Sequence, residues 1–283
     1  MLSIVTSMTN PEERGDPWKE ALNCFEDFGD EIIIKGNDWP YEFKWDHIGK
    51  TFESGIKEAS GDWVLMMGLD YFFHEKYKKK LLNSLLKYKD APAVAFPQYQ
   101  FFTPNYYSVK TRIALALNKK LYKDRLGFTG GSDLCLASLD GNTIDIRTIP
   151  NVNVPLFQYD FCFKSKDMIA EDRARFARAW FREFNNYEGR GGPDNDQAYD
   201  AWLQNIKTKY STHTHKTKIS NHPKYIQQKL RNLSPEQFGF DLFGYKFMVD
   251  KPPINFLKGL KEKHLNNLLF SNKNFFVYRN FPV

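Results

Sequence analysis

The stretch WVLMMGLD, residues 63–70, decides the fold. It is apolar from Trp63 to Leu69 apart from one glycine, and its first charge is Asp70. A continuous apolar run of this length is typical of a strand covered on both faces, whereas a half-exposed strand alternates apolar and polar residues. The run therefore predicts a strand in the middle of a sheet, with Asp70 at its carboxyl end.

Strands and helices alternate around this run. Short β-branched runs at 2–7 (LSIVTS) and 31–35 (EIIIK) predict two more strands, and apolar residues at helical spacing predict a helix between them. Further helices are expected from Ile48 to Ala59 and over 74–88, followed by a strand at 93–96. This alternation predicts an α/β fold with a Rossmann-like, mostly parallel central sheet flanked by helices.

The second half of the chain is less regular. A basic amphipathic helix over 164–184 is its clearest element, and aromatic residues crowd residues 98–107. The other expected elements are strands near 134–138 and 144–149, a short helix over 194–204, and short helices in the tail from about 222. We therefore predict one α/β domain over residues 1–210 and a mostly helical C-terminal extension over 211–283.

Composition narrows the class of protein. The 283 residues carry a formal net charge of +6, which is mild, and no DNA or RNA motif is present, so no nucleic-acid partner is expected. The three cysteines form no CxxC pair, which argues against a zinc site or a disulfide scaffold. No window approaches about 18 apolar residues and the N-terminus lacks a signal pattern. We expect a cytoplasmic protein with at most peripheral membrane contact.

Polar side chains stand where the predicted strands end. Thr6 lies at the end of the first strand, Asp38 follows the second, and Asp70 closes the third. Ligands of open α/β sheets bind at the carboxyl ends of the strands, so these residues are candidates for a nucleotide pocket. A carboxylate there also suits a divalent cation or a ribose hydroxyl. Purely structural roles, as satisfied strand ends or Asx turns, stay open for each of them.

Taken in order, these segments resemble a glycosyltransferase of the GT-A fold, of the family 2 type within the nucleotide-diphospho-sugar transferases. The segments are Ser3-Ile4-Val5-Thr6 with Asn10-Pro11, Glu31 to Ile34 with Asp38, and Gly55-Ile56 through Ala59 and Gly61-Asp62-Trp63 to Leu69-Asp70. The resemblance covers residues 1–75 well and extends loosely to about 210. It implies a nucleotide-sugar half over about 1–97 and an acceptor half over about 98–210.

The resemblance implies an activity and a partner for each half. The activity is the transfer of a sugar, with inversion, from a UDP- or GDP-sugar to a glycan or lipid-linked saccharide acceptor, as in polysaccharide biosynthesis. Thr6 is then expected to line the base pocket and Asp38 to contact the base. Asp70 is expected to hold the ribose and, through Mn²⁺ or Mg²⁺, the diphosphate.

The sequence departs from the family at the second acid of its D-x-D motif, which falls at Phe72. A phenyl ring cannot bind a metal, so His74, or Glu75 beside it, becomes the candidate second ligand for a cation at Asp70. The family's usual Asn before the glycine of the second helix is replaced by Glu53. These departures favour, as an alternative, a weakly active or inactive module that binds a nucleotide-sugar or a glycan.

Inversion requires a carboxylate that deprotonates the acceptor hydroxyl. Asp160, after an apolar strand, is the first candidate and Asp133, after Gly130-Gly131, is the second. Asp172 belongs to a Glu171-Asp172 pair like the one that usually carries the family's base. It falls inside the amphipathic helix, however, where charges are expected on a solvated face.

The aromatic cluster over 99–107 is a candidate wall for a sugar acceptor, with core packing as the alternative.

A third function, nucleotidyl transfer, is less favoured, because it normally uses a glycine-rich phosphate loop after the first strand. Here that place holds MTNPEERGD, residues 8–16, with a single glycine.

Overall fold

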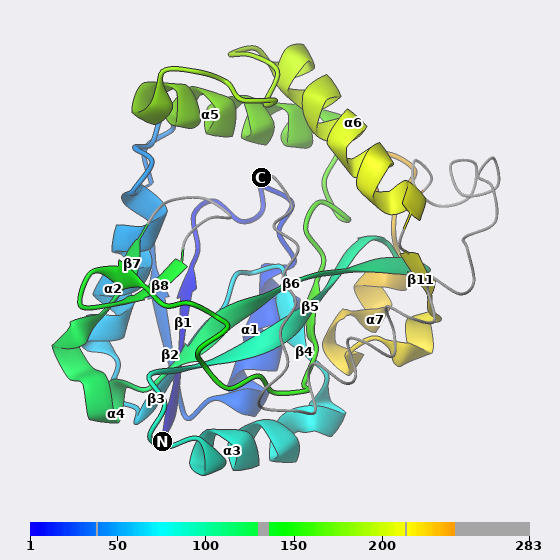
Figure 1. The fold of residues 1–283 in the computed structure, drawn as a ribbon. Helices are drawn as coiled ribbons and strands as arrows, with labels where there is room; N and C mark the ends of the chain where they lie inside the picture. Colours follow the sequence, from blue (N-terminus) through cyan, green and yellow to red (C-terminus); the bar gives the residue numbers. More distant parts are fainter. Residues whose placement is uncertain (38, 130–135, 213, 241–283) are drawn as a thin grey trace.

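A curled eight-stranded sheet forms the centre of the molecule (Figure 1). The structure is a computed structural model that describes residues 1–37, 39–129, 136–212 and 214–240. The strands lie in the order β2-β1-β3-β6-β5-β10-β4, and β11 pairs with β6. Their bounds are β1 Leu2–Ser7, β2 Glu31–Lys35, β3 Trp63–Met66, β4 Tyr71–Phe73, β5 Ala93–Thr103, β6 Tyr106–Leu117, β10 Leu156–Gln158 and β11 Thr214–Lys216.

The sheet is mostly parallel, as predicted. Only β4 and β6 run against the direction that the other six strands share. Two opposite edges of the molecule follow from this. The carboxyl edge is where β1, β2, β3, β5 and β10 end and β4 begins, and the amino edge is where those strands begin and β4 ends. Ligands of open α/β sheets bind at the carboxyl edge.

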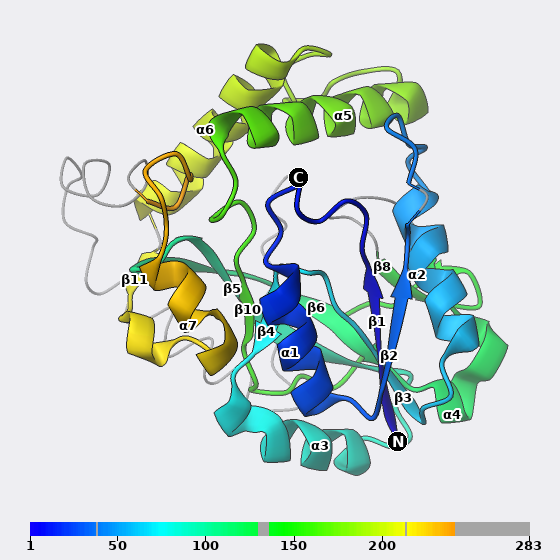
Figure 2. The ribbon, with the colours of Figure 1, turned by 180° about the vertical axis from the view of Figure 1, so that it is seen from behind.

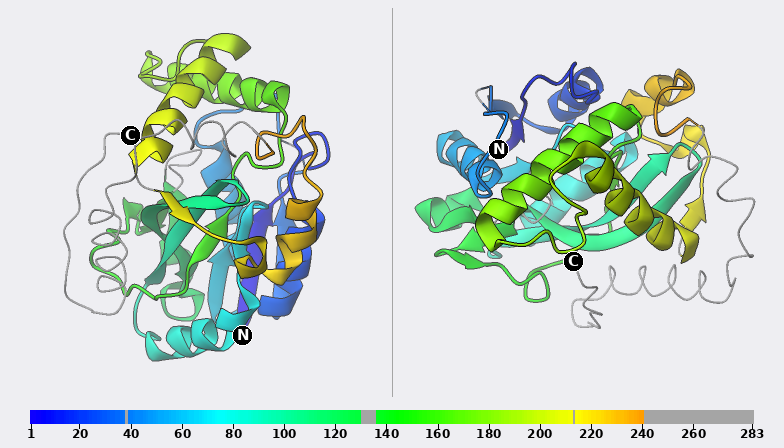
Figure 3. Two further views of the ribbon diagram at one scale, coloured as in Figure 1. Left: turned by 90° about the vertical axis from the view of Figure 1, so that its right-hand side faces the viewer. Right: turned by 90° about the horizontal axis from the view of Figure 1, so that it is seen from above.

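Helices cover the sheet and both of its edges. In Figure 2, which shows the molecule from behind, α1 lies in front of the sheet and α2 lies beside β2, while α3 lies below the amino edge. Figure 3 shows α5 and α6 crossing over the carboxyl edge. The helix bounds are α1 Trp18–Phe28, α2 His47–Glu58, α3 Lys78–Lys87, α4 Lys119–Tyr122, α5 Lys166–Phe184, α6 Asn195–Thr212 and α7 Lys224–Arg231.

The predicted first half of the fold is confirmed, and its core explains the apolar runs. Val5, Val64 and Leu65 are fully buried in the central strands. Gly55 lets α2 approach β1, since a Cβ placed there would lie only 2.2 Å from a methyl carbon of Val5. A larger residue at this position would push the helix away from the sheet.

The second half differs from the prediction in one large element. The strand predicted at 93–96 continues to Thr103 and turns into β6, which gives a long antiparallel hairpin. A small sheet beside α2 holds β7 Leu126–Thr129, β8 Leu136–Leu139 and β9 Asn142–Thr143. No helix in the described part of the chain is long and apolar enough to cross a membrane.

The predicted C-terminal extension is described only as far as residue 240. It contributes α7, as expected, but also β11, which adds an edge strand to the main sheet. The predicted boundary at residue 210 falls within α6.

Candidate functional site

Three of the predicted site residues gather at the carboxyl edge. Asp70 lies between β3 and β4, and Asp160 lies two residues beyond β10. Thr6, in β1, is fully buried, and within the described part of the chain its hydroxyl has no hydrogen-bond partner. Asp38 and Asp133 lie outside the described residues, so their roles stay predictions.

Asp70 stands in a field of negative charge. Burial raises its pKa to about 7, and the charges of Asp160 and Asp16 add to the shift, while a hydrogen bond from Gln158 opposes it. Asp160 also accepts a hydrogen bond from Gln100 Nε2 at 2.8 Å. A carboxyl group whose pKa is raised to near neutrality by burial and neighbouring negative charges is a candidate member of a functional site.

His74 does not join Asp70. The two residues flank β4, whose three residues run from the carboxyl edge to the amino edge, so their Cα atoms lie roughly 13 Å apart. The His74 Nδ1 accepts a hydrogen bond from the backbone of Lys76, and its ring packs against Tyr77 and Phe157. A cation bound at Asp70 therefore cannot take His74 as its second ligand, and that expectation is corrected.

The carboxylates of Asp70 and Asp160 could hold a cation only if a bound substrate supplied further oxygen atoms to it. Mg²⁺ is commonly held by one or two carboxylates plus the phosphate oxygens of a substrate. Within the described residues no group of three or more His, Cys, Asp or Glu side chains is arranged to hold a metal ion. Phe72, at the place of the second acid, is fully buried against Tyr159.

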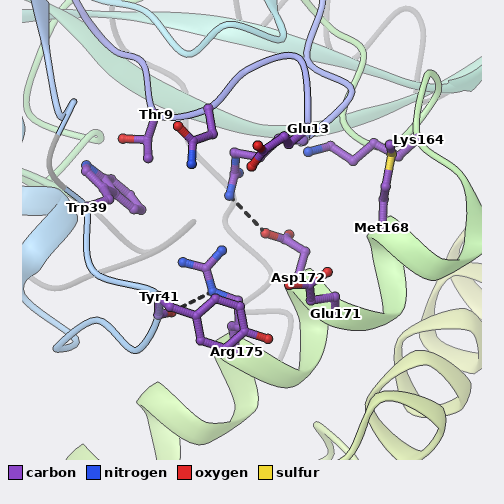
Figure 4. Close-up of a pocket in the computed structure, with 11 residues that line it drawn as sticks. Thr9, Glu13, Trp39, Tyr41, Lys164, Met168, Glu171, Asp172 and Arg175 are labelled. Atoms are coloured by element: carbon purple, nitrogen blue, oxygen red, sulfur yellow. Dashed lines mark hydrogen bonds and ion pairs between the residues drawn. The ribbon is translucent and has the colours of Figure 1, made fainter.

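A cavity of about 210 Å³ opens at the same edge, between the loop after β1, the loop after β2 and α5 (Figure 4). Two rings and three cationic side chains characterise its wall. The lining residues are Thr9, Asn10, Glu13, Arg14, Trp39, Tyr41, Lys164, Met168, Glu171, Asp172 and Arg175. The Trp39 Nε1 is buried and has no hydrogen-bond partner among the residues that the structure describes.

A buried ionic network holds this wall together. Arg14 pairs with Asp16 at 3.1 Å and with Asp172 at 3.4 Å, and Lys164 pairs with Asp16 at 2.9 Å. Asp70 also contributes to the raised pKa of Arg14, so the network lies within electrostatic reach of that carboxylate. The loop after β1 and helix α5 are thus joined through charges that are 158 residues apart in sequence.

Asp172 belongs to this network and is unsuited to act as a base. Burial alone would raise its pKa, but Arg173 and Arg14 outweigh burial and hold the pKa well below its usual range. A carboxylate that binds protons so weakly is a poor acceptor of a hydroxyl proton. The expectation that its helix position implies a solvated face is wrong, because only 8% of Asp172 is exposed.

Arg175 faces the cavity from α5. Figure 4 shows its guanidinium group directed into the cavity, where its Nε donates to the carbonyl of Tyr41 at 2.7 Å. Burial lowers the pKa of Arg175, and the positive charge of Arg14 lowers it further. Arg14 is already paired with Asp16 and Asp172, so Arg175 is the guanidinium group of the wall that is better placed to meet an anion, and Trp39 and Tyr41 add flat surfaces for a ring.

The aromatic cluster over 99–107 packs mainly within the protein. Phe101 and Phe102 are at most 1% exposed, and Phe102 lies against Trp202. Tyr99 and Tyr107 stack on each other with ring centroids 4.5 Å apart. The alternative of core packing is correct for Phe101 and Phe102, which cannot form an acceptor wall.

Comparisons with known proteins give distant structural likenesses only. No family model matches the sequence, and no curated protein matches it either. A crystal structure of residues 1–349 of S. aureus TarS in complex with UDP is similar at 12% identity and a TM-score of 0.34. That match covers 64% of this chain and 65% of that one. A second structure of the same TarS region is similar at 12% identity and a TM-score of 0.31, covering 73% and 72%.

Proposed function

We propose that this protein is a glycosyltransferase that moves a sugar from a nucleotide-diphospho-sugar to a hydroxyl acceptor, with inversion at the anomeric carbon. The observation that carries the proposal is the cavity at the carboxyl edge. It combines Arg14 and Arg175 with the rings of Trp39 and Tyr41, and the carboxylates of Asp70 and Asp160 lie at the same edge. Such a donor presents a flat base, a diphosphate and a sugar, which these groups match in kind.

The chemistry assigns a role to each group. Trp39 faces the base, and the guanidinium groups of Arg14 and Arg175 bind the diphosphate. Thr6 is fully buried, so it makes no direct contact with the donor in this proposal. Asp160 accepts the proton of the acceptor hydroxyl while the hydroxyl oxygen attacks the anomeric carbon of the donor sugar. The bond from that carbon to the diphosphate oxygen breaks in the same step, and the diphosphate leaves with the electron pair.

A divalent cation is part of the proposal, with Asp70 as its main protein ligand. When bound, it would neutralise charge on the diphosphate. The raised pKa of Asp70 supports this, because a carboxylate crowded by negative charge gains most from a cation. The residues of this chain still have to bind and orient the donor and to remove the acceptor proton.

The experiment compares three variants in an assay of donor consumption. Asp160→Asn is expected to lower kcat about 10²-fold to 10⁴-fold, as for loss of a general base. Arg175→Gln is expected to raise KM for the donor. Asp145→Asn is the control, since Asp145 pairs with Arg147 away from the cavity and its change should leave both constants unaltered.

Donor identity is tested by thermal shift. UDP-, GDP-, CMP- and dTDP-sugars are each added with and without Mn²⁺, and at least one should raise Tm in the parent but not in Arg175→Gln. If none stabilises the parent protein, the proposal is wrong. Tight binding of a donor that is not consumed with any acceptor would favour the binding module instead. The structural argument for that alternative is Phe72, a buried apolar residue at the place of the second acid.

A further inference from the structure

The outward face of α3 carries a cationic groove at the amino edge. The groove measures about 410 Å³ and is lined by Lys76, Lys79, Lys80, Asn83, Ser84 and Lys87. Figure 1 shows α3 at the end of the molecule opposite α5, the helix that contributes to the cavity wall. This basic surface is therefore separate from the proposed donor site.

The lysines of this groove lack carboxylate partners in the part of the chain that the structure describes. Lys78, on the inner side of the same helix, pairs with Asp27 at 3.3 Å. No such ion pair exists there for Lys79, Lys80 or Lys87. Four like charges along one surface repel each other, and an external anionic surface would relieve that repulsion.

The arginines of the other basic helix, α5, form ion pairs within the protein. In α5, Arg178 and Arg182 both pair with Glu42, and Arg173 pairs with Asp172. The sequence predicts α5 as a basic amphipathic helix, but in the structure these arginines bind carboxylates of the protein itself. The lysines of the α3 groove instead face outward.

We propose that this face of α3 adsorbs to a bilayer containing anionic lipids. Positions 79, 83, 86 and 87 fall on one side of the helix, and Leu86 is 73% exposed there. A helix face that combines lysines with an exposed apolar side chain suits a lipid interface, where the lysines meet headgroups and the leucine enters the acyl boundary. A soluble polyanion would use the lysines and leave Leu86 in water.

The proposal does not depend on the donor site. Adsorption through the amino edge leaves the carboxyl edge facing the water, where a soluble donor reaches the cavity freely. Donor binding in solution should thus be the same with and without vesicles. Failure of one proposal leaves the other standing, because vesicle binding and donor binding are measured separately.

The test is co-sedimentation with vesicles of phosphatidylcholine mixed with phosphatidylglycerol, compared with phosphatidylcholine alone. Each lysine near an anionic surface contributes about a fivefold gain in partition. The triple variant Lys79→Gln, Lys80→Gln, Lys87→Gln is therefore expected to bind mixed vesicles about 100-fold more weakly than the parent. Binding of the parent should fall at high salt, and Leu86→Ser should weaken it severalfold.

The matched control removes the same charge from the other end of the molecule. It is the triple variant Lys19→Gln, Lys50→Gln, Lys166→Gln, whose positions lie in the first turns of α1, α2 and α5. Retained binding by the control supports the assignment to α3. Equal loss in both triple variants would show a response to net charge only and overturn it. Binding to soluble polyphosphate without binding to mixed vesicles would overturn it too.

Discussion

At the scale of single residues, Asp70 is held in an unfavourable state. Its folded-state pKa of about 7 lies above the ordinary aspartate value of 3.8, so folding favours the neutral form. Ionised Asp70 therefore destabilises the fold above pH 7, and that cost disappears as the pH falls from 7 to about 4. A residue kept at such a cost is better explained by a ligand than by stability.

The first stability prediction follows from the upward shift of the Asp70 pKa. Asp70→Asn should raise the free energy of unfolding at pH 8 by on the order of 3 kcal/mol, because the amide carries no charge to desolvate. The gain should shrink toward zero near pH 4. Urea denaturation at both pH values measures it, with Asp145→Asn as the control. A loss of stability at pH 8 would contradict the environment described for Asp70.

Some of these residues could be predicted from sequence and others could not. Asp70 and Asp160 end or follow apolar runs, and the carboxyl ends of parallel strands meet at one edge. The pair of Arg14 with Asp172 depends on how α5 crosses that edge, which no local pattern specifies. The only signal was that Asp172 and Arg175 lie three residues apart on a helix and so share a face.

At the scale of elements, α5 holds the segment 40–43 against the cavity. Arg178 and Arg182 both bind the carboxylate of Glu42, and Arg182 also donates to the carbonyl of Phe43 at 2.7 Å. Burial would raise the pKa of Glu42, but the hydrogen bonds from the two arginines outweigh burial and lower it. This segment follows Trp39 and contains Tyr41, so its position fixes two rings of the cavity.

We predict that Glu42→Gln weakens donor binding more than it weakens the fold. The amide keeps the shape but loses charge-assisted hydrogen bonds, so the segment should be held less firmly. The expected result is a rise of about threefold to tenfold in KM or Kd, with about 1 kcal/mol or less of stability lost, since Glu42 is 40% exposed. Equilibrium binding and urea denaturation measure the two effects.

The control for this change is Glu58→Gln, which removes a somewhat more exposed pairing between Lys35 and Glu58, the last residue of α2. It should leave donor binding unaltered. Equal donor affinity in the two variants would mean that the Glu42 contacts do not position the cavity wall.

Strand β5 shows why the sequence pattern predicted too short a strand. The strand predicted at 93–96 stopped at Pro97, because proline usually interrupts a strand. In the structure a register shift between Phe96 and Gln98 accommodates it, and the strand continues to Thr103. Almost every residue of β5 is buried, so it lacks the alternation that would reveal a strand.

At the scale of the whole molecule, the half-buried carboxyl group of Asp70 and the buried imidazole of His222 respond to acid in opposite directions. His222 is fully buried, with Nε2 donating to the carbonyl of Pro104 at 2.9 Å and Nδ1 accepting from the hydroxyl of Tyr159 at 2.7 Å. Burial lowers its pKa to about 4, although the contact with Pro104 opposes the shift. The stability that neutral His222 contributes is complete above pH 6.5, the pKa of histidine in the unfolded chain, and is lost as the pH falls toward 4.

The last prediction rests on the balance between His222 and Asp70. Over nearly the same pH window, acid relieves the cost at Asp70 and removes the stability at His222, each on the order of 3 kcal/mol. Burial lowers the pKa of His74 as well, which adds to the His222 side. Carboxylates with lowered pKa values, such as Asp27 at about 2, lose their effect only below about pH 4. The parent protein should therefore show a nearly constant free energy of unfolding between pH 7 and 4.

Variants separate the two opposing contributions, because each leaves one of them uncompensated. Asp70→Asn should become less stable as the pH falls from 7 to 4, whereas His222→Gln, although less stable at pH 7 through lost packing, should gain stability over the same range. Urea denaturation at half-unit pH steps gives the two slopes directly. Slopes of the same sign in both variants would contradict the assigned protonation states. Opposite slopes would mean that the acid response of the whole chain is set by one carboxyl group at the carboxyl edge and one imidazole two residues before α7.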